Sequence, residues 1–197
     1  RVPSIGEDQM KYCPKCASEL ISRAEGGRDR LACSSCDYVF FGDFSIGVGG
    51  VVMRDGKALL IRRGQEPRRG WWQIPGGYCE HDESIHDAVA REVMEEAGIH
   101  ARVENVLGLR HSLGAPSANV YVIFRLTPLD GVPRADGDEI TGAGFFSLDE
   151  IAALDKVQSL SKWAINAALG RSDGFVQVGE PGDLARPGYT LFGLPPG

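Results

Sequence analysis

Short apolar runs separated by polar turns divide most of the chain into segments typical of strands, and two longer segments have the apolar spacing of helices. Asp55-Gly56 stands between the first two apolar runs of the central region, and this dipeptide favours a tight hairpin turn. The predicted strands are Ser45–Met53, Ala58–Ile61, Ala101–Leu109, Ala118–Leu126 and Gly144–Ser147. Strands mixed with helices in this way indicate an α+β fold or an α/β sandwich.

The first predicted helix has start and stop signals at its two ends. Ser84 suits the N-cap, and Asp87 three residues later makes a variant of the capping box. Gly98 suits the left-handed position that ends a helix. We therefore predict a helix over Ile85–Ala97. The residues expected to face the core are Ala90, Val93, Met94 and Ala97.

A second helix is predicted over Ser159–Leu169, with Gly170 as its stop. Trp163 lies at helical spacing from Leu160, Ala164 and Ala167, a pattern more often found in a core than at a cofactor. The tail that follows is rich in glycine and proline and is expected to dock on the domain or to contact a partner.

Composition limits the classes of function. The chain has 197 residues, of which 43% are apolar, enough for one domain with a small module. The net charge of −6 argues against a polybasic nucleic-acid surface. No apolar run approaches the roughly 20 residues that span a bilayer, and the first 12 residues lack the apolar segment of a secretory signal. We expect a cytoplasmic protein without membrane contact.

Four of the five cysteines form two pairs with the same spacing, Cys13-x-x-Cys16 and Cys33-x-x-Cys36. Paired knuckles of this kind are typical of a zinc ribbon, in which four thiolates hold one structural Zn²⁺ ion. Redox dithiols or free thiols are the alternative, and zinc is favoured because this spacing suits a metal better than disulfide exchange. We predict a zinc ribbon over residues 1–43, with an apolar face of Tyr12, Leu20, Ile21, Leu31, Tyr38 and Phe40. Cys79 is left as a free thiol.

Three acids carry the most informative chemistry. Glu92, Glu95 and Glu96 stand at i, i+3 and i+4 of the first predicted helix and therefore share one face. Three carboxylates so close repel one another unless a cation lies among them, and a hard divalent cation prefers such oxygen ligands. An acidic, solvated helix face is the simpler interpretation. The metal interpretation is favoured because the acids belong to a longer frame with Gly77 and Glu83.

This frame, GYCEHDESIHDAVAREVMEEAGI from Gly77 to Ile99, resembles the Nudix box of the Nudix hydrolases at every specified position. The resemblance implies the Nudix αβα sandwich, a mixed sheet with flanking helices, here preceded by the small zinc ribbon. The domain is expected over residues 44–155, and residues 156–197 then form a C-terminal helix and a Gly/Pro-rich tail. Many members of the family are dimers, so a homodimer is a candidate state.

The resemblance also assigns roles to residues. Glu92, Glu95 and Glu96 would hold catalytic Mg²⁺ or Mn²⁺, and Arg91 would orient them by salt bridges. Glu83 would be a weaker ligand or would brace the loop, and Asp82 replaces a usual glycine. Gly76 and Gly77 would let the backbone bend against the helix.

The catalytic base is the position where the chain departs from the family. The family commonly has a glutamate three residues after the position of Glu139, and this chain has Gly142 there. Asp138 or Glu139 would stand in for it, or Glu92 or Glu95 would activate the water directly. Glu139 is the candidate from this loop.

Substrate choice rests on the combination of segments. The cysteine-rich start, the RRGQEPRRGWWQIPGG approach to the box and the ANVYVIFRL strand resemble zinc-ribbon Nudix hydrolases of the ADP-ribose/FAD diphosphatase group. The SQPWPFP signature of NADH diphosphatases is absent, and residues 111–117 (HSLGAPS) occupy that region. Arg62, Arg63, Arg68 and Arg69 would steer phosphates, although exposed loop arginines are more often simply solvated. Trp71 would stack on a base, whereas Trp72 is expected in the core. The substrate-binding candidates are Arg62, Arg68, Trp71, Gly76 and Gly77.

The predicted function is therefore metal-dependent hydrolysis of the diphosphate linkage of nucleoside diphosphate-X compounds, with ADP-ribose or FAD favoured. The alternative is a non-catalytic regulator on a Nudix fold that senses a nucleotide or contacts nucleic acid. The intact box favours the enzyme, and the net charge disfavours nucleic acid.

Overall fold

The structure is a computed structural model that describes residues 10–112, 118–170, 174–177 and 192–193. The chain divides into two compact units, residues 1–45 with 111–119 and residues 46–110 with 120–197. Residues 113–117 of the region compared with the NADH diphosphatase signature lie outside the described residues, as does most of the tail beyond residue 170. The predicted boundaries after residues 43 and 155 stay a prediction.

The first unit is built on an antiparallel hairpin of β1 (Leu20–Glu25) and β2 (Arg28–Cys33), joined through two glycines of positive φ. Its small core consists of Cys13, Leu20 and Cys33, against which Leu31, Cys36, Tyr38 and Met10 pack. The predicted apolar face is wrong at two positions, because Tyr12 is 65% exposed and Ile21 is 45% exposed. Ile21 follows buried Leu20 on the same strand, and successive side chains of a strand point to opposite faces.

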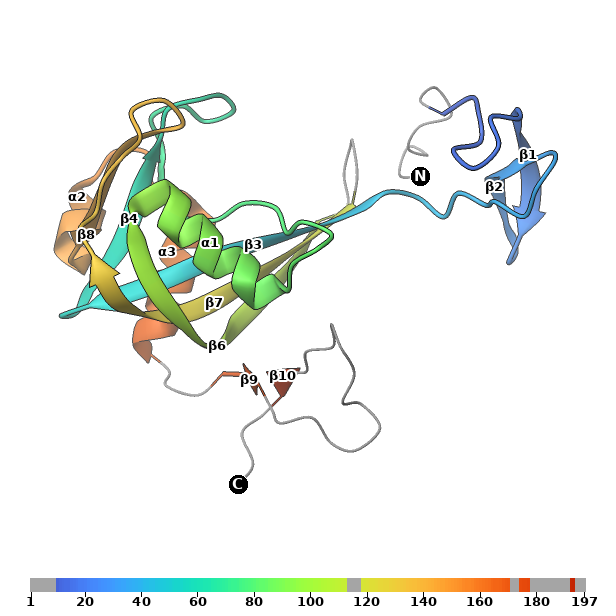
Figure 1. Ribbon diagram of the computed structural model, residues 1–197. Coiled ribbons are helices and arrows are strands. Elements are labelled where there is room, and N and C mark those ends of the chain that lie inside the picture. The colour runs from blue at the N-terminus through green and yellow to red at the C-terminus, as the bar shows by residue number, and fades with distance from the viewer. Residues whose placement is uncertain (1–9, 113–117, 171–173, 178–191, 194–197) are drawn as a thin grey trace. The chain divides into compact units, whose positions relative to one another are not determined.

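The second unit contains a six-stranded sheet (Figure 1) in the order β5-β4-β3-β7-β6, with β8 paired to β4. All five strands expected from the sequence are present. The bounds are β3 Phe44–Arg54, β4 Lys57–Arg63, β5 Trp72–Gln73, β6 Ile99–Ser112, β7 Ala118–Gly131 and β8 Ile140–Phe146. The turn between β3 and β4 has positive φ at Asp55 and Gly56, as a two-residue hairpin turn requires.

Helices cover both faces of this sheet. Along β3, Val48 and Val52 pack in one core cluster with the buried face of α1 (Ile85–Ala97), whereas Val51 packs in the other with α3 (Ser159–Gly170). Because successive side chains of a strand point to opposite faces, β3 contributes to two cores, one on each side of the sheet. This confirms the predicted α+β sandwich with flanking helices. In the described part of the chain, no helix combines the length and apolar character needed to cross a membrane.

Helix α1 begins and ends where its capping signals predict. The Ser84 side chain accepts a hydrogen bond from the backbone N–H of Asp87, and Gly98 adopts φ 69° at the C-cap. The buried residues are Ala88, Val89, Val93 and Ala97. The predicted core face was therefore partly wrong, because Ala90 and Met94 are only half-buried.

The C-terminal helices differ from expectation in two ways. A short helix, α2 (Leu148–Ala153), was not predicted, although Ser147 and Glu150 form a complete capping box at its start. In α3, Ala164 is buried as expected, but Trp163 is 50% exposed and lies over Gly108 of β6.

A short piece of the tail extends the sheet at the outer edge of β6. Phe175 and Val106 exchange two backbone hydrogen bonds, with N···O distances of 2.7 and 3.2 Å. The residue before it must be glycine, because a Cβ at Gly174 would lie 2.5 Å from the Val106 carbonyl oxygen. Phe175 leads directly into β9 (Val176–Gln177), which pairs with β10 (Phe192–Gly193).

Candidate active site

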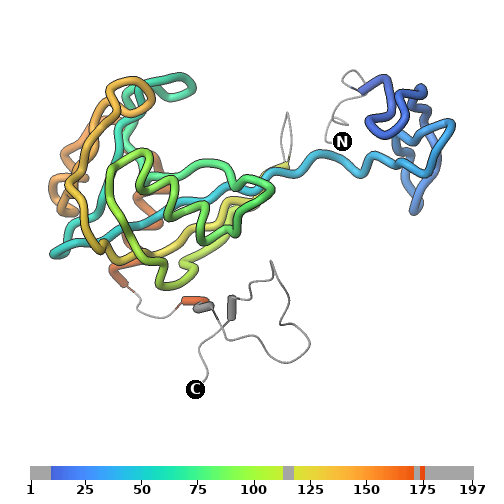
Figure 2. Tube along the Cα trace, viewed as in Figure 1, coloured from blue at the N-terminus to red at the C-terminus, as the bar shows by residue number. Residues whose placement is uncertain are grey.

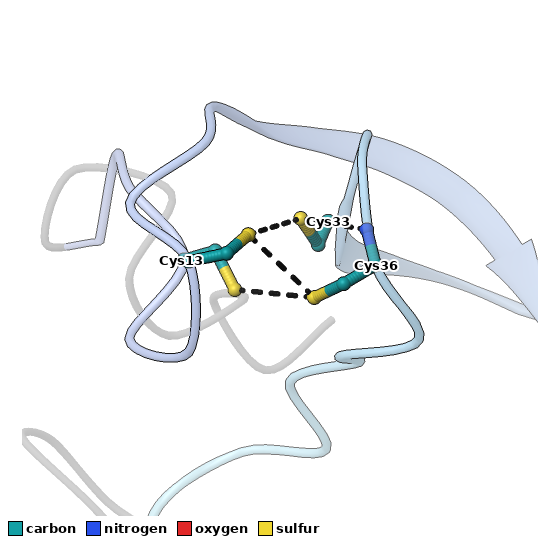
Figure 3. A group of neighbouring side chains, drawn as sticks. Cys13, Cys33 and Cys36 are labelled. Carbon is teal, nitrogen blue, oxygen red and sulfur yellow. Dashed lines mark hydrogen bonds between the residues drawn. The ribbon is translucent and has the colours of Figure 1, made fainter.

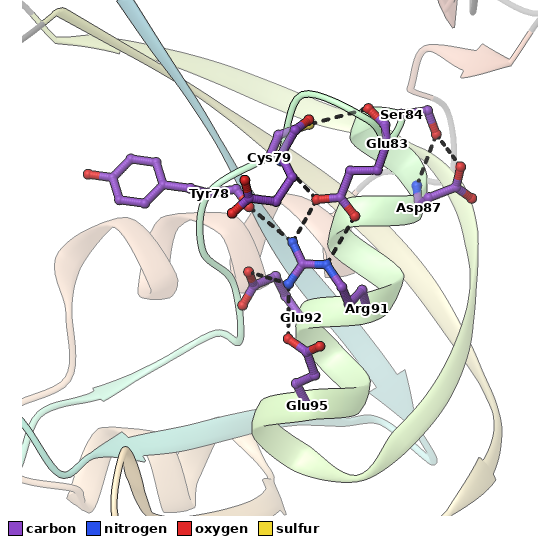
Figure 4. A network of polar contacts seen from close by, with 9 residues as sticks. Tyr78, Cys79, Glu83, Ser84, Asp87, Arg91, Glu92 and Glu95 are labelled. Atoms are coloured by element: carbon purple, nitrogen blue, oxygen red, sulfur yellow. Dashed lines mark hydrogen bonds and ion pairs between the residues drawn. The ribbon is translucent and has the colours of Figure 1, made fainter. Parts of the chain in front are cut away.

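The acids of α1 are joined by one arginine (Figure 4). Arg91 donates from Nε and Nη2 to both carboxylate oxygens of Glu83, at 3.0 and 2.7 Å. Its Nη1 atom donates to Glu92 and to Glu95, each at 2.9 Å, and Nη2 also reaches the carbonyl oxygen of Tyr78 at 3.1 Å. One guanidinium thus fixes the loop before the helix and two of the three helix acids. Its hydrogen bonds lower the pKa of Glu83.

Glu96 lies deeper and has a different partner. Its Oε2 atom accepts a hydrogen bond of 2.7 Å from the backbone N–H of Gly76. Burial raises the pKa of Glu96 from 4.5 to about 8, and the charge on Glu92 adds to this. Burial also raises the pKa of Glu92. Carboxylates held in this way resist ionisation until a cation offsets their charge.

The two glycines before the box allow the loop to approach the acids. Gly76 has φ 155°, and a Cβ there would lie 2.2 Å from the Val48 carbonyl oxygen. A Cβ on Gly77 would lie 2.5 Å from Glu92 Oε1. Gly76 has no space for a side chain, and a side chain at Gly77 would displace the carboxylate of Glu92.

The acids open into a cavity of about 420 Å³. Two loops that are distant in sequence meet beside it, the one after β4 and the one before β8, as the trace in Figure 2 shows. The Gly64 N–H donates to the Glu139 carbonyl oxygen across them at 2.7 Å. The lining residues are Arg63, Gln65, Gly76, Gly77, Tyr78, Glu80, Glu92, Glu95, Glu96, Asp136, Glu139 and Ile140.

The structure therefore brings together six of the expected site residues, namely Glu92, Glu95, Glu96, Glu139, Gly76 and Gly77. Glu83 is not in the lining and lies behind it as the main partner of Arg91. Asp136 was not among the candidates. It follows Pro133-Arg134-Ala135 in a polar segment, and nothing local in the sequence signals that this loop folds against α1.

Three expected substrate contacts, Arg62, Arg68 and Trp71, lie outside the lining. Arg62 donates from Nε to the Gly70 carbonyl oxygen at 3.4 Å, within its own loop. Arg68 donates to Gln158 Oε1 at 3.1 Å and stands 5.9 Å from the centre of the Trp71 ring. Trp72 packs in the core edge-on against Phe146, with ring centres 5.0 Å apart, as predicted.

Gly142, at the position where the resemblance implies a further acid, does not line the cavity. Gly142 pairs with Arg62 across β4 and β8, and a Cβ there would meet the Trp72 ring at 3.2 Å. Glu139 lines the cavity instead, close enough for its charge to raise the pKa of Glu96.

The four paired cysteines converge on one point in the first unit (Figure 3). The Sγ atoms of all four lie within 4.8 Å of one another, and three of the separations are 3.5, 3.7 and 3.7 Å. A tetrahedral site with Zn–S bonds of about 2.3 Å has Sγ···Sγ edges of about 3.8 Å. Backbone N–H groups of Ser35 and Cys36 donate to Cys33 Sγ at 3.2 and 3.3 Å, which suits a thiolate. These residues fit a tetrahedral metal ion.

The family model described as NUDIX domain matches residues 43–166. The chain belongs to the Nudix family. Its frame from Gly77 to Ile99 is the Nudix box, and the cavity described above is built on it.

Relatives and solved structures agree with this assignment. An ADP-ribose pyrophosphatase of Methanocaldococcus jannaschii is 35% identical over 112 residues, which are 56% of this chain and 66% of that protein. An NAD-capped RNA hydrolase NudC of Stutzerimonas stutzeri is 29% identical over 175 residues, which are 88% of this chain and 61% of that protein. A crystal structure of a Nudix hydrolase from Nitrosomonas europaea has a TM-score of 0.69 at 28% identity and covers 79% of this chain and 88% of its own. The chain thus spans less than two thirds of the length of the two sequence relatives.

Proposed function

We propose that this Nudix protein is a diphosphatase that hydrolyses the diphosphate linkage of nucleoside diphosphate-X compounds with Mg²⁺ or Mn²⁺. The observation that carries the proposal is the gathering of Glu92, Glu95 and Glu96 in one cavity with a further acid, Glu139, on the opposite loop. An acidic, solvated helix face would not need Gly76 and Gly77 to admit the loop against two of these carboxylates.

Glu92, Glu95 and Glu96 are the residues that would hold the catalytic metal, with Glu83 contributing from behind through Arg91. The fit rests on their chemistry: the carboxylates are hard oxygen donors, and burial and mutual repulsion raise the pKa of both Glu92 and Glu96. When bound, a divalent cation neutralises phosphate oxygens and lowers the pKa of an attacking water.

The residues of the chain have separate tasks around that ion. Arg91 holds Glu92 and Glu95 in place through ion pairs of 2.9 Å. Gly76 orients Glu96 through its N–H. Glu139 would accept the proton of the attacking water, because it faces the helix acids across the cavity, where a bound diphosphate would lie. Glu92 and Glu95 remain the alternative bases.

The cysteine cluster would hold a structural Zn²⁺ ion through Cys13, Cys16, Cys33 and Cys36. The part of this unit that the structure describes has only four buried apolar residues, Cys13, Leu20, Ala32 and Cys33. A bound metal would therefore supply folding free energy that so small a core does not.

ADP-ribose and FAD are the favoured substrates, and the relative named ADP-ribose pyrophosphatase supports the first of them. The relative named NAD-capped RNA hydrolase matches 88% of this chain, so NAD-type compounds belong in the test. A cytoplasmic location and a homodimer are part of the proposal. A non-catalytic nucleotide sensor is the competing function.

The experiment incubates the chain with Mg²⁺ or Mn²⁺ and a panel of ADP-ribose, FAD, NADH, ADP-sugars and nucleoside triphosphates, and quantifies nucleoside monophosphate products. We expect the first two compounds to be hydrolysed fastest. Glu95→Gln should abolish turnover with little change in stability, since its side chain is 60% exposed. Glu104→Gln, an acid of β6 outside the cavity, is the matched control. Nucleotide binding without turnover across the panel would favour the sensor.

A further inference from the structure

We propose that Arg63 is the residue that grips the diphosphate in the cavity, and this inference rests on the proposed function. Six carboxylates line the cavity, from Glu80, Glu92, Glu95, Glu96, Asp136 and Glu139, and Arg63 is the one basic side chain among the lining residues. A diphosphate anion entering this cavity therefore meets a single fixed cation.

Strand alternation directs Arg63, and not Arg62, into the cavity. The pairing of β4 with β8 shifts between Arg62 and Arg63, so that Arg62 faces Gly142 and Arg63 faces Ile140. The register skips Thr141, so the bulge lies in β8, and successive side chains of β4 still point to opposite faces. As a result the two neighbouring arginines differ: Arg62 is exposed, whereas Arg63 is half-buried and lines the cavity.

The backbone of Arg63 is held firmly. Its N–H donates to the Trp71 carbonyl oxygen at 3.0 Å, and its carbonyl oxygen accepts from the Gly70 N–H at 2.8 Å. Its side-chain Nε donates to the Pro67 carbonyl oxygen at 3.0 Å. Residues at the far end of the loop and in its middle thus hold Arg63 in place. Because the side chain is already ordered, less conformational entropy is lost when a ligand binds.

The outer part of the guanidinium is available for a ligand. Within residues 10–112, 118–170, 174–177 and 192–193, Arg63 forms no ion pair, and its two Nη atoms donate no hydrogen bond. Arg91, by contrast, uses its guanidinium on three carboxylates. Arg63 is nevertheless near Glu96, because its charge lowers the pKa of that residue against the effect of burial. An arginine with two unused Nη donors in an acidic cavity suits bidentate contact with phosphate oxygens.

The helix acids, which would hold the metal, and the guanidinium of Arg63 line the same cavity, and a diphosphate bound there would lie between them. The metal would be bound from the α1 side and Arg63 would approach from the end of β4. Contacts from two sides would hold the linkage in place for attack.

Kinetics of Arg63→Gln test this inference, with saturating Mn²⁺ and ADP-ribose as the probe substrate. We expect kcat/KM to fall about 10- to 100-fold, the value of a lost hydrogen bond to a charged group. Arg102→Gln removes the same charge from β6, outside this cavity, and should stay within about twofold of the wild-type protein. Arg63→Lys should recover only part of the loss, because lysine lacks the planar pair of donors.

Two further measurements separate phosphate contact from a structural role. Millimolar guanidinium should restore activity to Arg63→Ala and leave the wild-type protein unchanged. Mn²⁺ affinity without substrate should be equal or tighter in Arg63→Gln, because a positive charge near the acids is lost. Wild-type kcat/KM in Arg63→Gln, or weakened Mn²⁺ binding with no rescue by guanidinium, would overturn the inference and leave the proposed function standing.

Failure of the proposed function has a different signature. If the wild-type protein hydrolyses nothing on the panel, calorimetry of ADP-ribose binding in the presence of Mn²⁺ replaces kinetics. Weaker binding by Arg63→Gln than by Arg102→Gln then supports the phosphate contact in a non-catalytic protein. Equal binding by the two variants, or no binding by the wild-type protein, rejects it.

Discussion

Replacing Glu96 by glutamine should change how the stability of the Nudix unit depends on pH when no divalent metal is present. Burial raises the pKa of Glu96 from 4.5 to about 8 in the folded protein. In the unfolded chain the side chain is in water and ionises near its ordinary value. Between these two pH values the unfolded state has lost a proton that the folded state keeps, so stability falls as the pH rises.

The size of this effect follows from the two pKa values. Each pH unit in the window contributes about 1.4 kcal/mol, so the whole window from 4.5 to 8 corresponds to about 5 kcal/mol of unfolding free energy. The contribution is fully present below pH 4.5 and is lost as the pH approaches 8. Glu96→Gln cannot ionise, and it should therefore be more stable than the wild-type protein at pH 8.

Urea unfolding at several pH values between 5 and 8, in metal-free buffer without chelator, measures the difference. Trp71, Trp72 and Trp163 are the three tryptophans of the chain and all belong to the second unit, so their fluorescence reports on that unit without the cysteine cluster. Glu95→Gln makes the same chemical change at a side chain that is 60% exposed, and it should keep the wild-type slope. Added Mg²⁺ should stabilise the wild-type protein more at pH 8 than at pH 5, because metal and proton compete for the carboxylates. Equal pH slopes for wild-type protein and Glu96→Gln would refute the reasoning.

Three further changes test other parts of the structure. Gly77→Ala places a Cβ 2.5 Å from Glu92 Oε1 and should lower turnover roughly 100-fold, while the circular dichroism spectrum stays that of the wild-type protein. Turnover at the wild-type rate would show that Glu92 need not hold its position. Ser84→Ala removes the N-cap of α1 and should cost about 1 kcal/mol in urea unfolding, whereas Ser84→Asp should cost little; equal losses in the two variants would contradict the capping role. Elemental analysis should find about one zinc ion per chain, and this ion should be lost in Cys33→Ser and kept in Cys79→Ser. A wild-type protein that contains no zinc and still has its β1–β2 hairpin folded would reject the zinc site.

Features set by local chemistry could be predicted from the sequence. Helix α1 has its predicted bounds because Ser84 and Gly98 act within a few residues of its ends. The short helix α2 has an equally local signal in Ser147 and Glu150, so it too could be predicted from the sequence. The box acids share a cavity because helical spacing alone places them on one face.

Features set by pairing between distant segments could not be predicted. β6 and β7 continue past their predicted ends, since hydrogen bonds to neighbouring strands extend them beyond the apolar runs. The register between β4 and β8, with its bulge at Thr141 of β8, is set by pairing of distant segments, so nothing near Arg63 in the sequence shows that it lines the cavity. Asp136 reaches the cavity for the same reason, through a loop that meets α1 only in the folded chain.

The pairing of Phe175 with Val106 has a consequence for the behaviour of shortened chains. β6 is the last strand of its sheet, and its outer backbone groups would otherwise be a template for a strand from another molecule. The Gly174–Phe175 segment occupies this edge at its middle through two hydrogen bonds. A chain cut after α3 would keep the complete cavity but would present an uncovered edge, and it would then be prone to aggregation without any loss of its active-site residues.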